Sequence, residues 1–323
     1  MARRGALDAL PELAAPLLAR CRFPPPGTSV TCAVSGGPDS LALLALAVAA
    51  GCEVTAVHVD HQLRPGSADE ALVAARAAAG LGVTLVTERV VVGAGPNLEA
   101  RARAARHAVL PEGTLLGHTA DDQAETMLLN LLRGAGLDGL AAMAPDDRRP
   151  ILALRRSDTV GLCAALGLDP VHDPSNDDPS IRRNRVRHEV LPLLAEVAGR
   201  DVVPVLARQA ALLREAAELL AAEAGALDVT DAAALASAPP ALARIAIRTW
   251  LRGCSAEGHP PDGPTVERVL AVARLDQRAT DVGAGWRVAR TEGRLRLVAP
   301  TTPAGPSRSS GSGGAAPAPP PVR

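Results

Sequence analysis

Between residues 29 and 154, short apolar runs alternate with longer segments in which apolar residues recur at helical spacing. The short runs predict five strands, at 29–34, 52–59, 83–92, 113–119 and 149–154. The longer segments predict helices at 39–50, 67–82, 97–110 and 121–135. Strands that alternate with helices indicate right-handed β-α-β units. We therefore expect an α/β fold with a parallel five-stranded sheet flanked by helices.

The pattern changes beyond about residue 205, where long Ala- and Leu-rich helical segments replace the alternation. The stretch 285–298 alternates in period two around a turn, which predicts a hairpin. Near the start, Asp8 and Glu12 interrupt an amphipathic segment, which favours a surface helix over a signal peptide. We expect four parts: an N-terminal helix (1–27), an α/β domain (28–200), a smaller, mainly helical domain (201–300) and a disordered Pro/Gly/Ser-rich tail (301–323).

The amino-acid composition excludes several kinds of functional site. None of the 34 basic residues is a lysine, which excludes a Schiff-base lysine and a Walker-type phosphate lysine but leaves Arg for bidentate phosphate contacts. Aromatic residues make up only 1%, which argues against base-stacking platforms. The five cysteines are scattered and form no C-x-x-C, which disfavours zinc and suits a reducing cytosol. No apolar stretch is long enough to span a membrane, so a cytoplasmic protein is expected.

The first predicted strand runs into Ser-Gly-Gly-Pro-Asp-Ser (35–40) and then directly into a helix. Gly36 and Gly37 allow successive N–H groups to point into one concavity, where the helix N-terminus adds partial positive charge. Ser35 and Ser40 offer hydroxyl donors, and Asp39 suits Mg²⁺ or a polar substrate group. The motif is neither a Walker loop nor a G-x-G-x-x-G. It predicts either a phosphate cradle or a tight turn.

Polar side chains also follow the second predicted strand, where His58, Asp60 and His61 could suggest a metal site. An extended segment places the rings of His58 and His61 on opposite faces, which weakens that interpretation. A polar strand end near a nucleotide is favoured, and a solvated loop is the alternative.

The predicted helix 97–110 carries Glu99, Arg103 and Arg106 on one face. This face is either a salt-bridged surface or an arginine face that lies near an anionic substrate.

The fourth predicted strand ends in a crowd of polar residues: His118, Asp121, Asp122, Gln123 and Glu125. Acids in a first helical turn suit the helix dipole, so capping explains part of the pattern. It does not explain the adjacent His and Gln. The acids could hold Mg²⁺ that bridges a triphosphate, or an amino group of a substrate.

A turn-rich segment with Asp173, Asn176 and Asp177 runs directly into a series of arginines. These are Arg182, Arg183, Arg185 and Arg187. A dense arginine patch indicates phosphate contact with RNA or a nucleotide, and the alternative is a solvated basic helix.

The loop at 35–40 resembles the PP-loop of the N-type ATP pyrophosphatases. Further motifs resemble the tRNA(Ile)-lysidine synthase family. In chain order these are S-G-G-P-D-S, H-V-D-H-Q-L-R, N-L-E-A-x-A-R, G-H-T-A-D-D-Q-A-E-T, L-L-R-G-A-G-L-x-G-L-A-A-M and D-P-S-N-x-D-x-x-x-x-R-N-x-x-R. The resemblance is strong over 28–194 and weak to about 298, and it implies an adenine nucleotide α hydrolase-like fold.

The resemblance implies a two-step reaction. ATP activates the C2 oxygen of the wobble cytidine of a CAU anticodon in tRNA(Ile) with release of pyrophosphate, and the amine of free L-lysine then displaces AMP to give lysidine. ATP is a substrate, Mg²⁺ is implied as a cofactor, and the helical domain would bind tRNA. The implied ATP-binding residues are Ser35, Gly36, Gly37, Pro38, Asp39 and Ser40. The implied catalytic residues are Asp39, His118, Asp122 and Glu125, with Asp39 and Asp122 as Mg²⁺ ligands. The implied tRNA or substrate contacts are Arg103, Arg106, Arg133, Asp173, Asn176, Arg182, Arg183, Asn184 and Arg187.

Two departures from the family pattern stand out. His107 replaces an aromatic residue, which puts a stacking role there in doubt, and a second C-terminal domain found in some members is not expected. A PP-loop tRNA thiolase is one alternative function, although its paired cysteines are missing. A non-catalytic nucleotide-binding sensor is the other. The sequence leaves both a monomer and a homodimer open.

Overall fold

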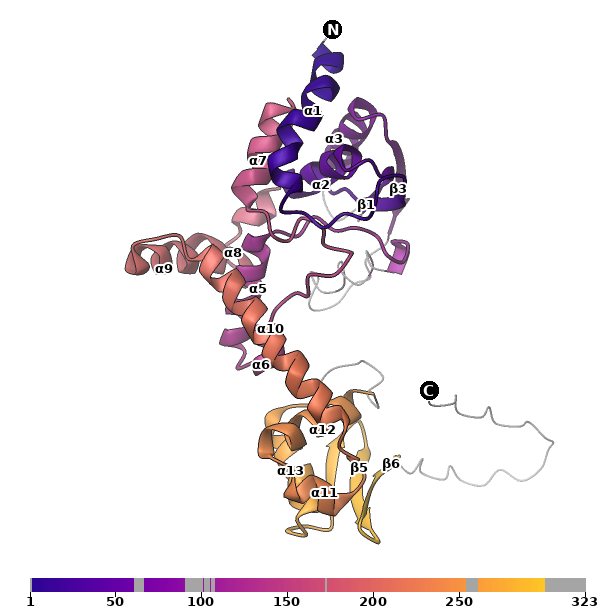
Figure 1. Cartoon of the computed structure of the whole chain (residues 1–323), viewed down its shortest axis with the longest axis vertical. Helices are drawn as coiled ribbons and strands as arrows, with labels where there is room; N and C mark the ends of the chain where they lie inside the picture. Colours follow the sequence, from indigo (N-terminus) through magenta and orange to yellow (C-terminus); the bar gives the residue numbers. More distant parts are fainter. Residues whose placement is uncertain are drawn as a thin grey trace, which may run out of the picture. The chain divides into compact units, whose positions relative to one another are not determined.

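A computed structural model describes residues 2–60, 67–90, 101, 105, 108–171, 173–253 and 261–299. The chain divides into two compact units, Met1–Ala217 and Glu218–Arg323, and the division falls inside helix α10 (Val203–Gly225) (Figure 1). None of the described helices is long and apolar enough to cross a membrane.

The sheet of the first unit has three parallel strands in the order β1-β2-β3. They are β1 (Ser29–Ala33), β2 (Glu53–Asp60) and β3 (Thr84–Arg89). Thr31 is opposite Thr55 in β2, and Val57 is opposite Val86 in β3. The parallel sheet of β-α-β units is therefore confirmed, and its carboxyl edge is the expected position for a ligand.

The expectation of five strands is wrong. Segment 113–119 meets β1 only at an isolated parallel bridge between Leu115 and Cys32, because the chain then turns and His118 N–H donates to the Leu116 carbonyl (2.9 Å). Segment 149–154 forms turns, in which Leu152 and Leu154 donate to carbonyl groups three residues earlier. These local hydrogen bonds, together with Pro150, which has no N–H, remove the donors that a strand would need.

Four helices share the core on one face of this sheet (Figure 1). They are α1 (Ala2–Leu18), α2 (Pro38–Ala49), α3 (Ser67–Gly80) and α7 (Arg156–Ala165). Helices α2 and α3 pack on the strands, and α1 and α7 pack against α2. Helix α2 is buried without interruption from Ser40 to Ala47, as expected for a helix that is apolar on all sides. Leu10 and Ala14 of α1 are also in this core, so the N-terminal helix is a surface helix with one buried face.

The opposite face of the sheet is covered by a smaller core. Val57 of β2 packs there with Leu110 and Leu116. Because side chains alternate along a strand, Ala56 belongs to the larger core and Val57 to the smaller one.

The remainder of the first unit is helical. Its elements are α5 (Ala120–Leu132), α6 (Leu137–Leu140), the 3₁₀ turn η1 (Pro174–Asp177), α8 (Arg182–Arg185), the π-helical turn η2 (Val186–Val190) and α9 (Leu191–Ala198). Ala124 of α5 packs with Val186 of η2 and Val203 of α10. This third core places the arginines of α8 and η2 beside the start of α5. Most of the predicted helix 97–110 lies outside the described residues.

The second unit combines helices with a three-stranded antiparallel sheet. The helices are α11 (Ala232–Ser237), α12 (Pro240–Arg252) and α13 (Gly263–Ala273). The strands are β4 (Ala279–Gly283), β5 (Trp286–Thr291) and β6 (Arg294–Val298), in that order. The predicted hairpin is confirmed as β5–β6, and positive φ angles at Glu292 (52°) and Gly293 (77°) match a type I′ turn. The tail predicted at 301–323 lies outside the described residues.

Candidate nucleotide-binding site

A cavity of about 560 Å³ opens at the carboxyl ends of β1 and β2. Its lining includes an apolar group that packs together, Val57, Val59 and Leu116, and a charged group in mutual contact, Asp39, Asp122 and Arg156. The loop Ser35–Ser40 lies along the cavity wall between the end of β1 and the start of α2. The cavity therefore combines space for an apolar ring with charged groups and a helix N-terminus.

The hydroxyl group of Ser40 holds the loop in its curled form. Ser40 Oγ donates to the Gly37 carbonyl (2.8 Å) and accepts from the Ser35 N–H (3.1 Å). Gly36 has a φ of +86°, and a Cβ there would lie 3.3 Å from the Glu70 carbonyl oxygen. Glycine is therefore needed at position 36, both for the backbone angle and for space.

The curl directs backbone donors to the cavity. Among the described residues, the N–H groups of Gly36, Gly37 and Asp39 donate to no protein acceptor, whereas the Gly36 carbonyl accepts from Val171 N–H (3.0 Å). Free N–H groups at the start of a helix are the donors that bind phosphate oxygens. Of the two interpretations that the sequence left open, this geometry favours the phosphate cradle.

Asp39, at the start of α2, faces two residues of α7. Thr159 Oγ1 donates to its Oδ1 (2.5 Å), and Arg156 Nε lies 3.1 Å from its Oδ2. Burial raises the pKa of the Asp39 carboxyl above its usual value, and its two hydrogen-bond partners only partly offset this. A nearby cation therefore stabilises the ionised form of Asp39.

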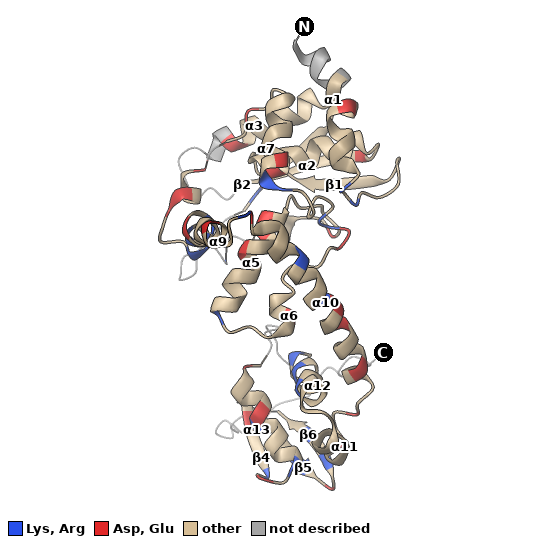
Figure 2. Cartoon of the chain, turned by 60° about the vertical axis from the view of Figure 1, so that its left-hand side comes forward, with Lys and Arg blue, Asp and Glu red and all other residues tan. Residues whose placement is uncertain are grey.

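Asp122 caps its own helix and also faces two guanidinium groups. Its Oδ2 accepts from the N–H (2.9 Å) and the hydroxyl (3.0 Å) of Thr119. Its Oδ1 lies 3.0 Å from Arg183 Nη2 and 3.3 Å from Arg156 Nη2. Burial opposes ionisation, but the two arginines and the Thr119 N–H outweigh it and lower the pKa of Asp122. Figure 2 shows acidic residues at this end of α5.

Glu125 is fully buried one turn farther along α5, and three arginines surround it. Arg183 Nε and Arg187 Nε each lie 2.6 Å from one of its oxygens, and Arg156 Nη1 lies 3.4 Å from Oε1. A buried carboxylate is stable only when it is paired in this way. The carboxylate thus fixes the position of three cations, of which Arg156 and Arg187 line the cavity.

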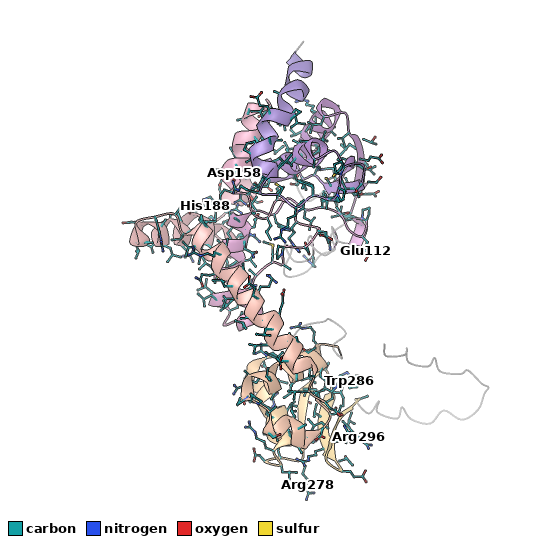
Figure 3. The ribbon with its side chains drawn as sticks, viewed as in Figure 1. Glu112, Asp158, His188, Arg278, Trp286 and Arg296 are labelled. Atoms are coloured by element: carbon teal, nitrogen blue, oxygen red, sulfur yellow. The ribbon has the colours of Figure 1, made fainter. Side chains whose placement is uncertain are left out.

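The sequence analysis did not identify Arg156, which contacts Asp39, Asp122 and Glu125 and thereby joins the loop to α5. These acids, above all Asp122, outweigh the effect of burial and raise the pKa of Arg156. Two neighbours fix the start of α7. Arg155 N–H donates to Asp158 (2.8 Å), labelled in Figure 3, and Arg156 N–H donates to Asp121 (2.8 Å). The only sequence signal was a pair of arginines after an apolar run, which is too common to indicate a site.

The remaining predicted arginines lie in different environments. Arg183 and Arg187 point to Glu125, whereas Arg182 and Arg185 are exposed and Arg185 pairs with Glu189 (2.8 Å). Arg133 is exposed at the end of α5. Arg103, Arg106, His61 and His107 lie outside the described residues.

The acidic loop before α8 is held by local hydrogen bonds. Asp173 accepts from Ser175 N–H (2.8 Å), and buried Asn184 donates to the Ser175 carbonyl (2.7 Å). The Asn176 carbonyl bonds to His188 Nε2 (3.1 Å), which is labelled in Figure 3. Asn176, His188 and His118 line the cavity. Asn184 therefore holds the loop in place, whereas Asn176 lies where a ligand in the cavity could reach it.

Comparison with known proteins identifies the family of this chain. Residues 15–194 match the PP-loop domain family. A tRNA(Ile)-lysidine synthase from Nocardia farcinica is 43% identical over 298 residues, which cover 85% of this chain and 93% of the relative. One from Thermobifida fusca is 39% identical over 304 residues, with the same two coverages.

The chain belongs to the tRNA(Ile)-lysidine synthase family. A solved U34-tRNA thiolase from Methanococcus maripaludis shares the fold, with a TM-score of 0.50 and 15% identity over 66% of this chain and 80% of that one. Membership of a PP-loop family agrees with the curled loop at Ser35–Ser40 and its free N–H groups.

Asp39 and Asp122 can supply two of the ligands of Mg²⁺, but the other ligands must come from a bound substrate or from water. Within the described ranges, no group of three or more His, Cys, Asp or Glu side chains is placed to hold a metal ion by itself. Both aspartates line the cavity, and burial together with the charge of Asp122 raises the pKa of Asp39. Mg²⁺ is commonly bound by one or two carboxylates plus substrate phosphates. The pair therefore suits a cation that arrives with a triphosphate.

Proposed function

We propose that this protein is an ATP-dependent ligase that joins free L-lysine to C2 of the wobble cytidine in the CAU anticodon of tRNA(Ile). The observation that carries the proposal is the 43% identity to a tRNA(Ile)-lysidine synthase over 85% of the chain. The product would be lysidine, and codon specificity would change from AUG to AUA.

In this proposal the Ser35–Ser40 loop binds the phosphates of ATP. Its free N–H groups and the start of α2 stabilise the negative charge that builds up as pyrophosphate leaves. Mg²⁺, held by Asp39 and Asp122, would neutralise phosphate charge. Arg156 already lies beside both aspartates (3.1 and 3.3 Å). Its guanidinium group is therefore positioned to pair with the negative charge of the phosphates when the nucleotide binds.

The acids of α5 are proposed to orient the ammonium group of lysine, and His118 to contact ligand or transfer a proton. Asp122 is suited to this role because its lowered pKa keeps it ionised. Glu125 is suited to an indirect role, since three arginines already surround its carboxylate.

We assign tRNA contact to exposed arginines in both units. Arg182 and Arg133 are exposed in the first unit. In the second, the register of β5 and β6 places exposed Arg287 and Arg296 on the sheet face opposite buried Val288 and Leu295. Figure 3 labels Arg296 and exposed Arg278 of the same unit. Phosphate contacts of this kind make binding weaken as salt concentration rises.

The test measures pyrophosphate release and incorporation of labelled lysine into a tRNA(Ile) transcript with a CAU anticodon. We expect lysine incorporation and continued pyrophosphate release only when ATP, Mg²⁺, tRNA and lysine are present together; without lysine, pyrophosphate release should stop once the tRNA is adenylated. A tRNA(Met) transcript with the same anticodon is the matched control. Release supported by cysteine or sulfide instead of lysine would indicate a thiolase, and nucleotide binding without turnover would indicate a sensor.

The loop variant Asp39→Ala separates nucleotide activation from tRNA binding. We expect it to abolish pyrophosphate release and to leave the dissociation constant for tRNA within about two-fold of wild type, because surface arginines supply most of that affinity. Loss of tRNA binding would show that the loop has been assigned the wrong role.

A further inference from the structure

Thr159 of α7 is a fully buried residue whose hydroxyl group contacts the carboxylate of Asp39. Its Oγ1 lies 2.5 Å from Asp39 Oδ1 and 2.9 Å from the carbonyl oxygen of Arg156, one turn earlier in the same helix. Both partners are acceptors, and a hydroxyl group has one proton to donate. The buried hydroxyl therefore has a partner in α7 itself, and its contact with Asp39 is an additional one between positions 120 apart in the chain.

Helix α7 is held against the start of α2 at a second point. Cys163 lies four positions after Thr159, on the same face of α7, and is 1% exposed. Its Sγ lies 3.4 Å from the carbonyl oxygen of Pro38. Two neighbouring residues of the loop, Pro38 and Asp39, are thus in contact with buried side chains of α7. The hydroxyl of Thr159 is therefore a fixed point beside the Asp39 carboxylate.

The two oxygens of Asp39 have different partners. Oδ1 accepts from Thr159, whereas Oδ2 lies 3.1 Å from Arg156 Nε. Arginine and carboxylate groups favour a two-pronged pair in which both oxygens face the guanidinium group. The hydroxyl on Oδ1 opposes that rotation and keeps one oxygen out of the pair. Because a carboxylate oxygen has two lone pairs, Oδ1 can accept from Thr159 and still bind a cation.

We infer that Thr159 is a positioning residue, whose hydroxyl holds Asp39 in the orientation in which its carboxylate binds Mg²⁺ together with ATP. The inference rests on the proposed function in that ATP and Mg²⁺ are taken as the ligands of this site. Residues that hydrogen-bond to a metal ligand commonly change metal affinity by about 10–100-fold. Thr159 therefore acts on the cation, and the phosphate contacts of the loop do not depend on it.

Three substitutions isolate the hydroxyl group. Thr159→Val replaces it with a methyl group of similar shape, and Thr159→Ser keeps it while removing the methyl group. Thr159→Ala removes both, so the Ser and Ala variants differ only in the hydroxyl. If Thr159 acts through packing, Val should resemble wild type and Ser should resemble Ala. If it acts through the hydroxyl, Ser should resemble wild type and Val should resemble Ala.

Calorimetry of the full-length proteins measures ATP affinity in saturating Mg²⁺ and in EDTA. The ratio of the two affinities is the gain that the metal gives to ATP binding. We expect Val and Ala to reduce this gain about ten-fold and Ser to stay within about two-fold of wild type. In EDTA all four proteins should bind ATP within about two-fold of one another. An electron paramagnetic resonance titration with Mn²⁺ in the presence of ATP detects the bound ion directly and should give the same order.

The inference is overturned if Val and Ala keep the full gain from Mg²⁺, or if wild type shows no gain. Equal losses in Mg²⁺ and in EDTA also overturn it, because the hydroxyl would then support the loop and not the cation. The same holds if Ser folds and the variants without a hydroxyl do not, since the role would be structural. Failure of the proposed function looks different: wild type would make no lysidine, whereas these measurements need neither tRNA nor lysine.

Discussion

Arg156 makes the contacts on which the arrangement of the site depends. Its guanidinium group lies 3.1 Å from Asp39, 3.3 Å from Asp122 and 3.4 Å from Glu125, so one side chain joins α2, α5 and α7. Removing it leaves Asp39 with Thr159 as its remaining side-chain partner, whereas Asp122 and Glu125 keep Arg183.

We predict that Arg156→Gln lowers the free energy of unfolding by about 1–3 kcal/mol, because partly buried carboxylates lose their charged partner. It should also weaken ATP binding. Arg156→Lys is the control, since it keeps the charge but cannot reach all three acids at once. Urea unfolding and calorimetric titration measure the two effects, and a Gln variant as stable as wild type would contradict the prediction.

The lowered pKa of Asp122 predicts a pH dependence. The folded protein holds this carboxylate ionised more strongly than the unfolded chain does, whose ordinary value is 3.8. The stabilisation is therefore fully present above that value and is lost as pH falls below it, through the folded-state pKa.

Asp122→Asn should accordingly be less stable than wild type at neutral pH, and the difference should shrink at about pH 3. Urea midpoints of the two proteins at both pH values measure this. A difference that stays constant would mean that the charge of Asp122 does not contribute to stability.

At the scale of elements, Gly117 fixes how closely the 113–119 segment approaches α2. A Cβ at this position would lie 2.8 Å from the carbonyl oxygen of Asp39, nearer than real Cβ atoms come to any atom. The obstacle is backbone at the start of α2, so it cannot move without disturbing the loop.

We predict that Gly117→Ala destabilises the protein by about 1–3 kcal/mol through overpacking and weakens ATP binding. Gly161→Ala is the matched control, because Gly161 is exposed in α7 with open space around it. Alanine there should stabilise the helix by up to about 1 kcal/mol. Thermal unfolding and ATP titration of both variants check the pair, and similar behaviour of the two would refute the steric argument.

Local pattern predicted the elements that local interactions stabilise. Helices α2, α3 and α5 and the hairpin β5–β6 were expected near their observed positions, because their periodicity, caps and turn residues lie within each segment. Two predicted strands were wrong. Apolar residues at 113–119 and 149–154 are buried, but the backbone groups of these segments form turns and an isolated bridge instead of a continuous strand ladder. Hydrophobicity alone does not predict which backbone hydrogen bonds a buried segment makes.

For the whole molecule, the important feature is that each unit has its own core. Ile247 of α12 is fully buried among residues of the second unit, and Leu44 of α2 is fully buried in the first. The cavity is lined entirely by residues of the first unit. Stability of the second unit and nucleotide binding should therefore be separable.

We predict that Ile247→Ala destabilises the second unit by about 2–5 kcal/mol and leaves ATP affinity unchanged. Leu44→Ala, a cavity-forming change of similar size, should weaken ATP binding. Limited proteolysis locates the loosened unit, and calorimetry measures affinity. Equal loss of ATP binding in both variants would show that the cores are coupled.

The sequence by itself determined the α/β class, the loop at 35–40, the acids of α5 and the family resemblance, because each is written in contiguous residues. Only the tertiary structure showed that Arg156, Arg183 and Arg187 meet at Glu125. Arg156 and Glu125 are 31 positions apart and meet through side chains from different helices. Periodicity within a segment carries no information on such long-range pairing, which is decided by how the elements pack.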